Sequence, residues 1–190
     1  IGDLKINFSY PQGEISDYRH ELDLHTAINT VSYKVGNTEY IRQCIASNPD
    51  DVVAMHIKAS RPKAITIELE LKLLRQANVV ASGNQLIYTG NAEFEKHGKG
   101  GVHFEGRIAV QIKGTIKAEG KKLYIEKATE VTLLSDVRTN FKNNTFSGYN
   151  YKIKCEKTIE LASKKDFKTL KKKHIEDYSP LFSRVGLSFE

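Results

Sequence analysis

The segment Ala64–Leu74 constrains the fold most tightly, because apolar and polar side chains alternate along it without interruption. Its apolar positions are Ile65, Ile67, Leu69, Leu71 and Leu73. The positions between them hold Thr66, Glu68, Glu70 and Lys72. Successive side chains of a strand point to opposite faces of the sheet. The alternation therefore predicts a strand with one buried and one wet face.

Further strands and hairpins are predicted on both sides of this segment. Strand patterns cover Val52–Ala59, Gly101–Lys113 and Glu130–Thr139. Tight turns are marked at Gly36-Asn37, Gly83-Asn84 and Glu119-Gly120. Such spacing favours a mostly β fold, an antiparallel sandwich or barrel. The loop from His97 to Gly101 is glycine-rich, but no helix follows it, so it does not fit a phosphate-binding loop.

The pattern changes from β to helical near residue 153. Ile153–Lys164 predicts one helix and Phe167–Phe182 a second, with Asp166 as its N-cap. An apolar stripe at helical spacing runs through Phe167, Leu170, His174, Tyr178 and Leu181. We expect Pro180 to kink or end the second helix. Arg184–Glu190 alternates again, as a returning strand would.

The charge of the chain is concentrated in one segment. Lys and Arg number 29 and Asp and Glu 23, a net charge of +6. The segment 152–173 carries nine Lys against three acids, which accounts for that whole excess. It holds no Arg and no interleaved aromatic platform, so nucleic-acid binding is disfavoured. No apolar run approaches the roughly 20 residues that span a bilayer, so no membrane partner is expected.

The cysteines and histidines suggest no metal site. Cys44 and Cys155 are far apart in sequence and favour two buried thiols, with a disulfide between them as the alternative. The six histidines show neither an HExxH motif nor zinc-ligand spacing. We therefore expect no metal and no cofactor.

The segment Tyr18–Ala27 is the most unusual stretch of the chain. As a strand it places four ionisable side chains on one face, the polar row, formed by Arg19, Glu21, Asp23 and His25. Such a row can be an ion-pair ladder, a wet surface or a functional groove. Two carboxylates on one strand face point the same way and are poorly placed to bracket a glycosidic bond. We interpret the row as structural or interfacial.

An ordered set of motifs carries a resemblance to a known family. The motifs are Gly2-Asp3-Leu4, Tyr18-Arg19-His20-Glu21-Leu22-Asp23-Leu24, Ser47-Asn48-Pro49-Asp50-Asp51-Val52, His174-Ile175-Glu176-Asp177-Tyr178, Leu181-Phe182 and Arg184-Val185. In this order they resemble the N-terminal domain of glycoside hydrolase family 95, the α-L-fucosidases with some α-L-galactosidases. His20 departs from the pattern, which more often has Arg there.

The resemblance implies a two-sheet antiparallel supersandwich, followed by linker helices that lead into an (α/α)6 barrel. We accordingly assign 1–152 to the supersandwich and 153–190 to the linker helices and the returning strand. In that family the barrel carries an inverting mechanism, with a general-acid Glu and an Asp–Asn system that activates water. No catalytic residue is therefore expected in this chain, which looks truncated at both ends and inactive alone.

The resemblance also implies a role and partners. We expect a non-catalytic domain that supports a catalytic barrel in cis, in an enzyme acting on α-L-fucosylated or α-L-galactosylated glycans. The polar row, together with Arg42, is the candidate surface toward that barrel or the substrate entrance. A periplasmic or secreted location follows from the resemblance, and exposed edges predict self-association of the isolated chain. The alternative is a stand-alone carbohydrate-binding module.

Overall fold

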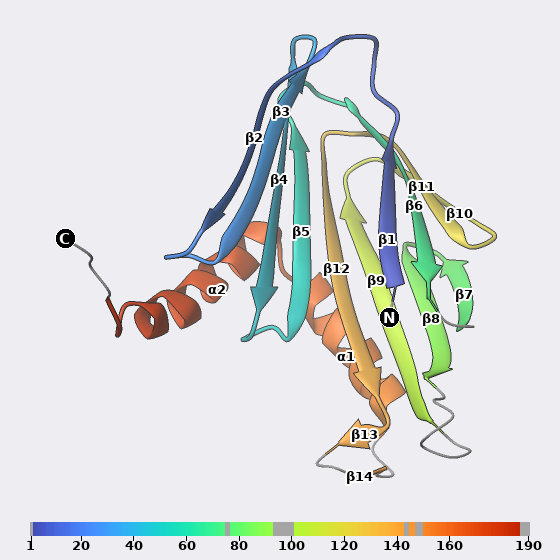
Figure 1. The fold of residues 1–190 in the computed structure, drawn as a ribbon. Coiled ribbons are helices and arrows are strands. Elements are labelled where there is room, and N and C mark those ends of the chain that lie inside the picture. Colours follow the sequence, from blue (N-terminus) through green and yellow to red (C-terminus); the bar gives the residue numbers. More distant parts are fainter. Residues whose placement is uncertain (1, 75–76, 93–100, 143–144, 147–149, 187–190) are drawn as a thin grey trace.

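The computed structural model describes residues 2–74, 77–92, 101–142, 145–146 and 150–186. In them a long series of strands precedes two helices, α1 (Tyr151–Ser163) and α2 (Phe167–Phe182) (Figure 1). The strands are β1 (Gly2–Phe8), β2 (Ile15–Asp23), β3 (Ile28–Val35), β4 (Thr38–Ser47), β5 (Val52–Ala59), β6 (Ile65–Leu73), β7 (Ala77–Ser82), β8 (Gln85–Ala92), β9 (Val102–Ile112), β10 (Thr115–Glu119), β11 (Lys122–Ala128), β12 (Glu130–Thr139), β13 (Phe141–Lys142) and β14 (Thr145–Phe146). No helix in these ranges is long and apolar enough to cross a membrane.

The strands form two antiparallel sheets that pack face to face. The small sheet has the order β1-β6-β11-β10, and the large sheet has the order β2-β3-β4-β5-β12-β9-β8-β7. A separate short hairpin joins β13 to β14. The predicted mostly β, two-sheet antiparallel sandwich is confirmed, and so are the four predicted strands, which became β5, β6, β9 and β12. The three predicted turns connect β3 to β4, β7 to β8 and β10 to β11.

One core lies between the two sheets. We call the face of the large sheet toward the small sheet its inner face. Fully buried side chains of the small sheet fill this core, among them Ile65, Ile67, Leu69, Leu123 and Ile125. They meet inner-face side chains that include Tyr33, Tyr40, Ile57, Leu86, Val110 and Leu133. The alternation that predicted β6 is therefore the centre of the sandwich, since its apolar face is buried on the large sheet.

A second core lies on the outer face of the large sheet, under the helices. Its sheet residues are Ile28, Ile45, Val52, Ala54, Ala109 and Leu134. The helices contribute Ile159, Ala162, Phe167 and Leu170. Asn150 and Asp166 cap the two helices by accepting bonds from Ile153 N (3.2 Å) and Thr169 N (2.8 Å). In Figure 1 both helices lie on the side of the large sheet away from β1 and β6.

The two covers do not overlie the same part of the large sheet. On β4, Tyr40 is buried on the inner face, whereas Ile45, farther along the strand, is buried on the outer face. On β5, Ile57 lies in the inner core and Ala54 in the outer one. On these two strands the inner cover lies toward one end and the outer cover toward the other. Two areas of the sheet are left open, one on each face.

The C-terminal predictions hold in part. Helix α1 starts two residues before the predicted Ile153, because Asn150 supplies the cap. Helix α2 has the predicted bounds, but it does not end at Pro180. The missing N–H of Pro180 falls in the last turn, close to solvent, where its loss is tolerated. Arg184–Gly186 is not a strand, and 187–190 lie outside the described residues, as does the predicted loop at 97–100.

Candidate functional site

The polar row lies at an open edge of the large sheet. Strand β2 is the edge strand, and all nine of its residues are exposed. Arg19, Glu21 and Asp23 share the outer face, because Asp23 pairs with Ile28, which lies in the outer core. Arg19 and Glu21 form an ion pair with 73% and 48% of their side chains exposed. Such an exposed pair contributes at most about 1 kcal/mol, so the row is not built for stability.

The row ends at Asp23, since His25 belongs to the β2–β3 turn rather than to the strand. The Asp23 carboxylate accepts bonds from Thr26 Oγ1 (2.7 Å) and His25 N (2.9 Å). These bonds, with the Thr26 hydroxyl first, lower the pKa of Asp23. The placement of His25 in the same row is therefore wrong: its side chain lies against the Phe182 ring, at 6.2 Å between centroids.

Helix α2 holds this turn by its backbone. A bond of 2.9 Å joins His174 Nε2 to the carbonyl oxygen of residue 26. Tyr178 Oη donates to the carbonyl of residue 24 (3.1 Å), and Ser179 Oγ donates to that of residue 25 (2.8 Å). The motif that begins at His174, one of those that carry the resemblance, therefore has a structural role here. It fixes the end of the β2–β3 hairpin to the helix.

Arg42 is separated from the polar row by the sheet itself. Its partner across the strands is Val31, and Val31 in turn faces His20, so Arg42 lies on the inner face. Its guanidinium is stacked over the rings of Phe8 (5.4 Å) and Tyr33 (5.2 Å). Its Nε atom is buried and has no hydrogen-bond partner in the described residues. Grouping Arg42 with the row was therefore wrong, because an even position of β4 faces the small sheet.

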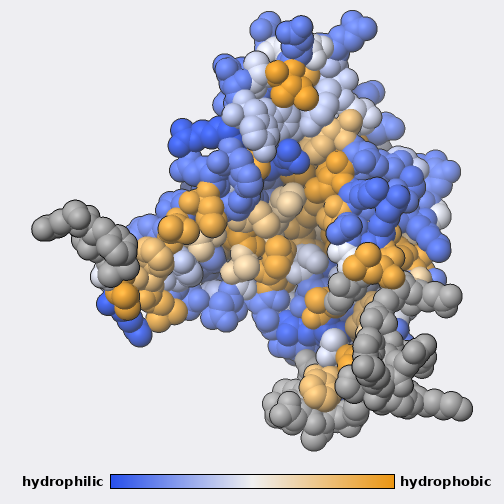
Figure 2. All heavy atoms as spheres, viewed as in Figure 1, coloured by the Kyte–Doolittle hydropathy of each residue, from blue (hydrophilic) through white to orange (hydrophobic). Residues whose placement is uncertain are grey.

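The open area of the inner face is apolar. We call it the apolar hollow, and its side chains are Leu22, Val31, Cys44, Val53, Met55 and Val137. Val53 is 47% exposed and Leu22 56% exposed. Figure 2 shows apolar surface gathered in a depression between β2–β3 and the small sheet. Contiguous apolar surface of this kind marks a contact area for another part of a protein.

A further apolar surface lies at the end of α2. Of the predicted stripe, Phe167, Leu170 and His174 are buried, Tyr178 is partly covered and Leu181 is 52% exposed. Leu24 in the β2–β3 turn and Phe182 are also exposed. The sheet therefore covers the stripe at its start and leaves it exposed to solvent at its end. Edge strand β2 therefore has exposed apolar residues both along it and just past its end.

The loop Ser47–Asp51 fastens the helices to the sheet. The Asp50 carboxylate is fully buried and pairs with Lys165, while Lys173 Nζ lies 3.9 Å away. Asp51, with φ of 59°, pairs with Arg138 and with Lys154 of α1 (3.7 Å). These carboxylates are engaged by lysine and arginine side chains. The motif that contains this loop, one of those that carry the resemblance, therefore holds α1 and α2 in place through ion pairs.

Neither cysteine is in a disulfide. Cys44 is partly buried in the hollow, and Cys155 is fully buried on α1. Burial raises the pKa of both thiols, that of Cys155 to about 12, so both are poor nucleophiles. No group of three or more potential metal ligands comes together within the described ranges.

The open area of the outer face is a basic groove that the sequence did not reveal as a site. It encloses about 600 Å³ between the α1–α2 connection, the middle of β4 and the ends of β5, β9 and β12. We call it the basic groove, because six lysines line it: Lys58, Lys113, Lys164, Lys165, Lys168 and Lys171. Two of them come from the sheet, far from the lysine-rich segment in sequence. Only the fold brings them together.

Comparison with known proteins places the chain. Residues 1–144 match the family described as "Glycosyl hydrolase family 65, N-terminal domain". The chain is 30% identical to "Alpha-L-fucosidase 2" of Arabidopsis thaliana and 28% identical to "Probable alpha-fucosidase A" of Aspergillus niger. These alignments cover 98% and 96% of the chain but 25% of each relative. The chain therefore spans about a quarter of the length of these curated relatives.

A solved structure has the same fold. "Putative kojibiose phosphorylase from human microbiome" gives a TM-score of 0.63 at 14% identity and covers 95% of this chain and 27% of that one. At that identity the likeness shows the fold alone. Fold and matches together define an N-terminal β-sandwich domain of the glycoside hydrolase type. The chain belongs to the family of glycosyl hydrolase family 65 N-terminal domains. The two fucosidase relatives confirm the resemblance to the family 95 enzymes.

Proposed function

We propose that this chain is the non-catalytic N-terminal domain of a glycoside hydrolase acting on α-L-fucosylated or α-L-galactosylated glycans. One observation carries the proposal: two fucosidases align along nearly the whole chain, which accounts for only a quarter of each. The carboxylates of the chain fit this role. Asp50, Asp136 and Glu105 are buried, but each is paired with lysine or arginine side chains that fasten helices or strands.

We further propose that a catalytic barrel in cis covers the apolar hollow and edge strand β2. The nine exposed residues of β2 leave a row of backbone groups and apolar side chains open to solvent. An edge of this length without a cover is an aggregation hazard in an isolated domain. The polar row then lies on the rim of the contact, where its charges set orientation rather than affinity. Without the barrel, the same surface favours self-association.

The experiment follows the reading frame of the source DNA past Glu190 and expresses the longer product beside this chain. We expect the longer product to hydrolyse fucosylated or galactosylated oligosaccharides and this chain alone to be inactive. A frame that stops at Glu190 contradicts the proposal, and so does glycosidase activity of this chain alone. We also propose a periplasmic or secreted location, because such glycans lie outside the cell.

The stand-alone carbohydrate-binding module stays open as the second candidate. It predicts saturable binding of fucosylated oligosaccharides by this chain alone. Isothermal titration with a fucosylated trisaccharide and its defucosylated counterpart separates the candidates. Binding that needs the fucose favours the module, whereas absence of binding favours the supporting domain.

A further inference from the structure

The basic groove concentrates charge that the rest of the molecule does not balance. The six lysines share the groove with two acids, Glu130 and Asp166. Lys164 and Lys165 are neutralised outside it by Glu160 and Asp50. Four lysines then face two acids. Neither Lys58 nor Lys113 has an ion pair within the part of the chain that the structure describes, although both flank Glu130 at the end of the sheet. Repulsion among such side chains is relieved when an anion binds between them.

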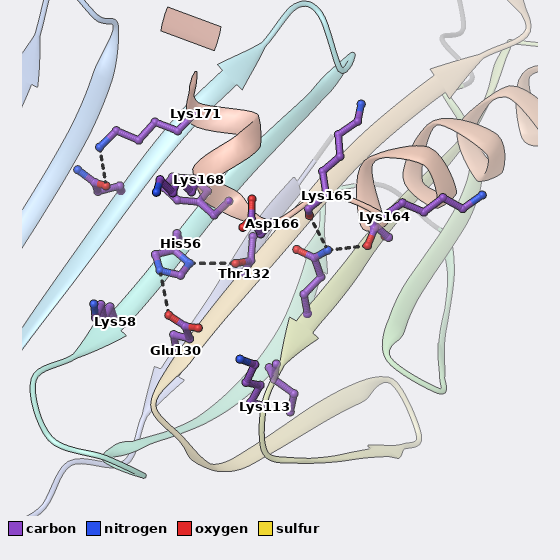
Figure 3. A pocket seen from close by; sticks show the side chains of 15 residues that line it. His56, Lys58, Lys113, Glu130, Thr132, Lys164, Lys165, Asp166, Lys168 and Lys171 are labelled. Atoms are coloured by element: carbon purple, nitrogen blue, oxygen red, sulfur yellow. Dashed lines mark hydrogen bonds and ion pairs between the residues drawn. The ribbon is translucent and has the colours of Figure 1, made fainter. Parts of the chain in front are cut away.

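The floor of the groove is ordered and polar. The His56 ring is stacked on Phe167 at 4.7 Å, and its Nδ1 lies 2.9 Å from Thr132 Oγ1 (Figure 3). Gln111 Nε2 donates to the carbonyl oxygens of Ser163 (2.8 Å) and Lys165 (3.0 Å). These contacts hold the connection between α1 and α2 against the sheet. The walls are therefore fixed before any ligand arrives, which lowers the entropy that binding costs.

Lysines reach the groove from both of its walls. Figure 3 shows Lys58 on β5, Lys113 just past the end of β9, and Lys168 and Lys171 on the helix across from them. Lys171 Nζ donates to Gln43 Oε1 (3.1 Å), which keeps this ammonium group over the sheet. A lysine-rich helix by itself is usually only a solvated face. Here the sheet adds cations opposite the helix, so the arrangement is that of a site for a ligand with several negative groups.

The lining favours an anionic saccharide over other polyanions. A nucleic-acid groove normally presents arginines and exposed aromatic platforms for bases, but no arginine lines this one, and Phe167 is buried under His56. The volume of about 600 Å³ fits a ligand of several sugar rings better than one inorganic anion. Amide, hydroxyl and imidazole groups on the floor suit the hydroxyls of a sugar.

We propose that the basic groove binds a sulfated oligosaccharide, with Lys58, Lys113 and Lys168 contacting its sulfate groups. This site lies on the opposite face of the large sheet from the apolar hollow. It does not depend on which reaction a catalytic barrel performs, so its failure leaves the proposed function intact.

The test is titration of the chain with a dextran sulfate oligosaccharide, with unsulfated dextran of the same length as the matched ligand. The groove variant is Lys58→Glu with Lys113→Glu. The control variant is Lys121→Glu with Lys127→Glu, which changes the net charge equally on two exposed lysines of the β10–β11 hairpin. We expect the groove variant to bind at least tenfold more weakly and the control variant to change less than twofold.

Three results overturn the proposal: equal weakening in both variants, equally tight binding of unsulfated dextran, and a groove-dependent affinity for single-stranded DNA that matches the one for the saccharide. Sodium sulfate alone should compete only at far higher concentration, since it engages one contact at a time. If it displaces the saccharide at equal concentration, the groove is a simple anion site and the proposal fails. If the groove variant does not fold, Lys58→Gln with Lys113→Gln replaces it and should still weaken binding.

Discussion

The apolar hollow and the basic groove are two open areas of one sheet, on opposite faces and with opposite chemistry. Both arise because the small sheet and the helices cover different ends of β4 and β5. The hollow exposes Val53 and Val137, whereas the groove exposes lysines. An apolar area gains free energy when another protein surface removes it from water. A basic area gains it from an anion. The difference indicates a domain that contacts another protein surface on one face of the sheet and an anion on the other.

The largest expected effect separates covered from open apolar positions. Leu170 of α2 is fully buried against the large sheet, and Leu170→Ala should lower the free energy of unfolding by roughly 2–4 kcal/mol, since the cavity cannot collapse fully. Leu22→Ala is the matched change in the hollow and should cost no more than about 0.5 kcal/mol. Urea unfolding measures both. Equal costs would show that the hollow is already covered in the isolated chain.

A smaller effect is expected at the loop Ser47–Asp51, which holds the helices that form one wall of the basic groove. Asp50→Ala removes the fully buried carboxylate that pairs with Lys165, and we expect a loss of roughly 2 kcal/mol, the range of hydrogen bonds to charged groups. Glu176→Gln, at an exposed pair with Lys172, is the control and should change stability by no more than about 0.5 kcal/mol. Similar values for both would mean that the loop does not hold the helices.

The hollow itself can be tested through self-association. Val53→Lys with Val137→Lys places two charges in it, and we expect a shift toward monomer in sedimentation velocity with the melting temperature changed by only a few degrees. Lys121→Glu with Lys127→Glu, far from the hollow, should leave the association unchanged. A wild-type chain that is already monomeric at high concentration contradicts the prediction.

The smallest effect is a pH dependence at the groove. Burial lowers the pKa of His56, Glu130 opposes this shift, and Lys58 and Lys171 add to it. The unfolded chain therefore takes up the proton first as pH falls below about 6.5, the ordinary histidine value. Stability should decline from pH 7 toward pH 5. His56→Gln should reduce the decline of the melting temperature between pH 7 and pH 5. An unchanged decline would contradict the assignment of this pH dependence to His56.

Sequence periodicity predicted the buried faces that depend on a single strand or helix. The alternation around Leu69 became a buried face, and so did the first half of the stripe through Leu170. Arg42 and His25 were misplaced because their surroundings depend on which face of β4 meets the small sheet and on where β2 ends in a turn. The groove was not predicted, since Lys58 and Lys113 meet Lys168 only through long-range pairing. A sequence pattern shows local periodicity, and it does not show which strands and helices pack together.

Hydrogen exchange of β2 and β4 tests the central claim most directly, with this chain and the longer product of its reading frame compared under the same conditions. We expect the amides of Ile15–Asp23 and of the hollow-facing part of β4 to exchange more slowly in the longer product, while β6, at the centre of the sandwich, exchanges equally in both. Equal exchange of β2 in the two products would contradict a catalytic barrel seated on the hollow.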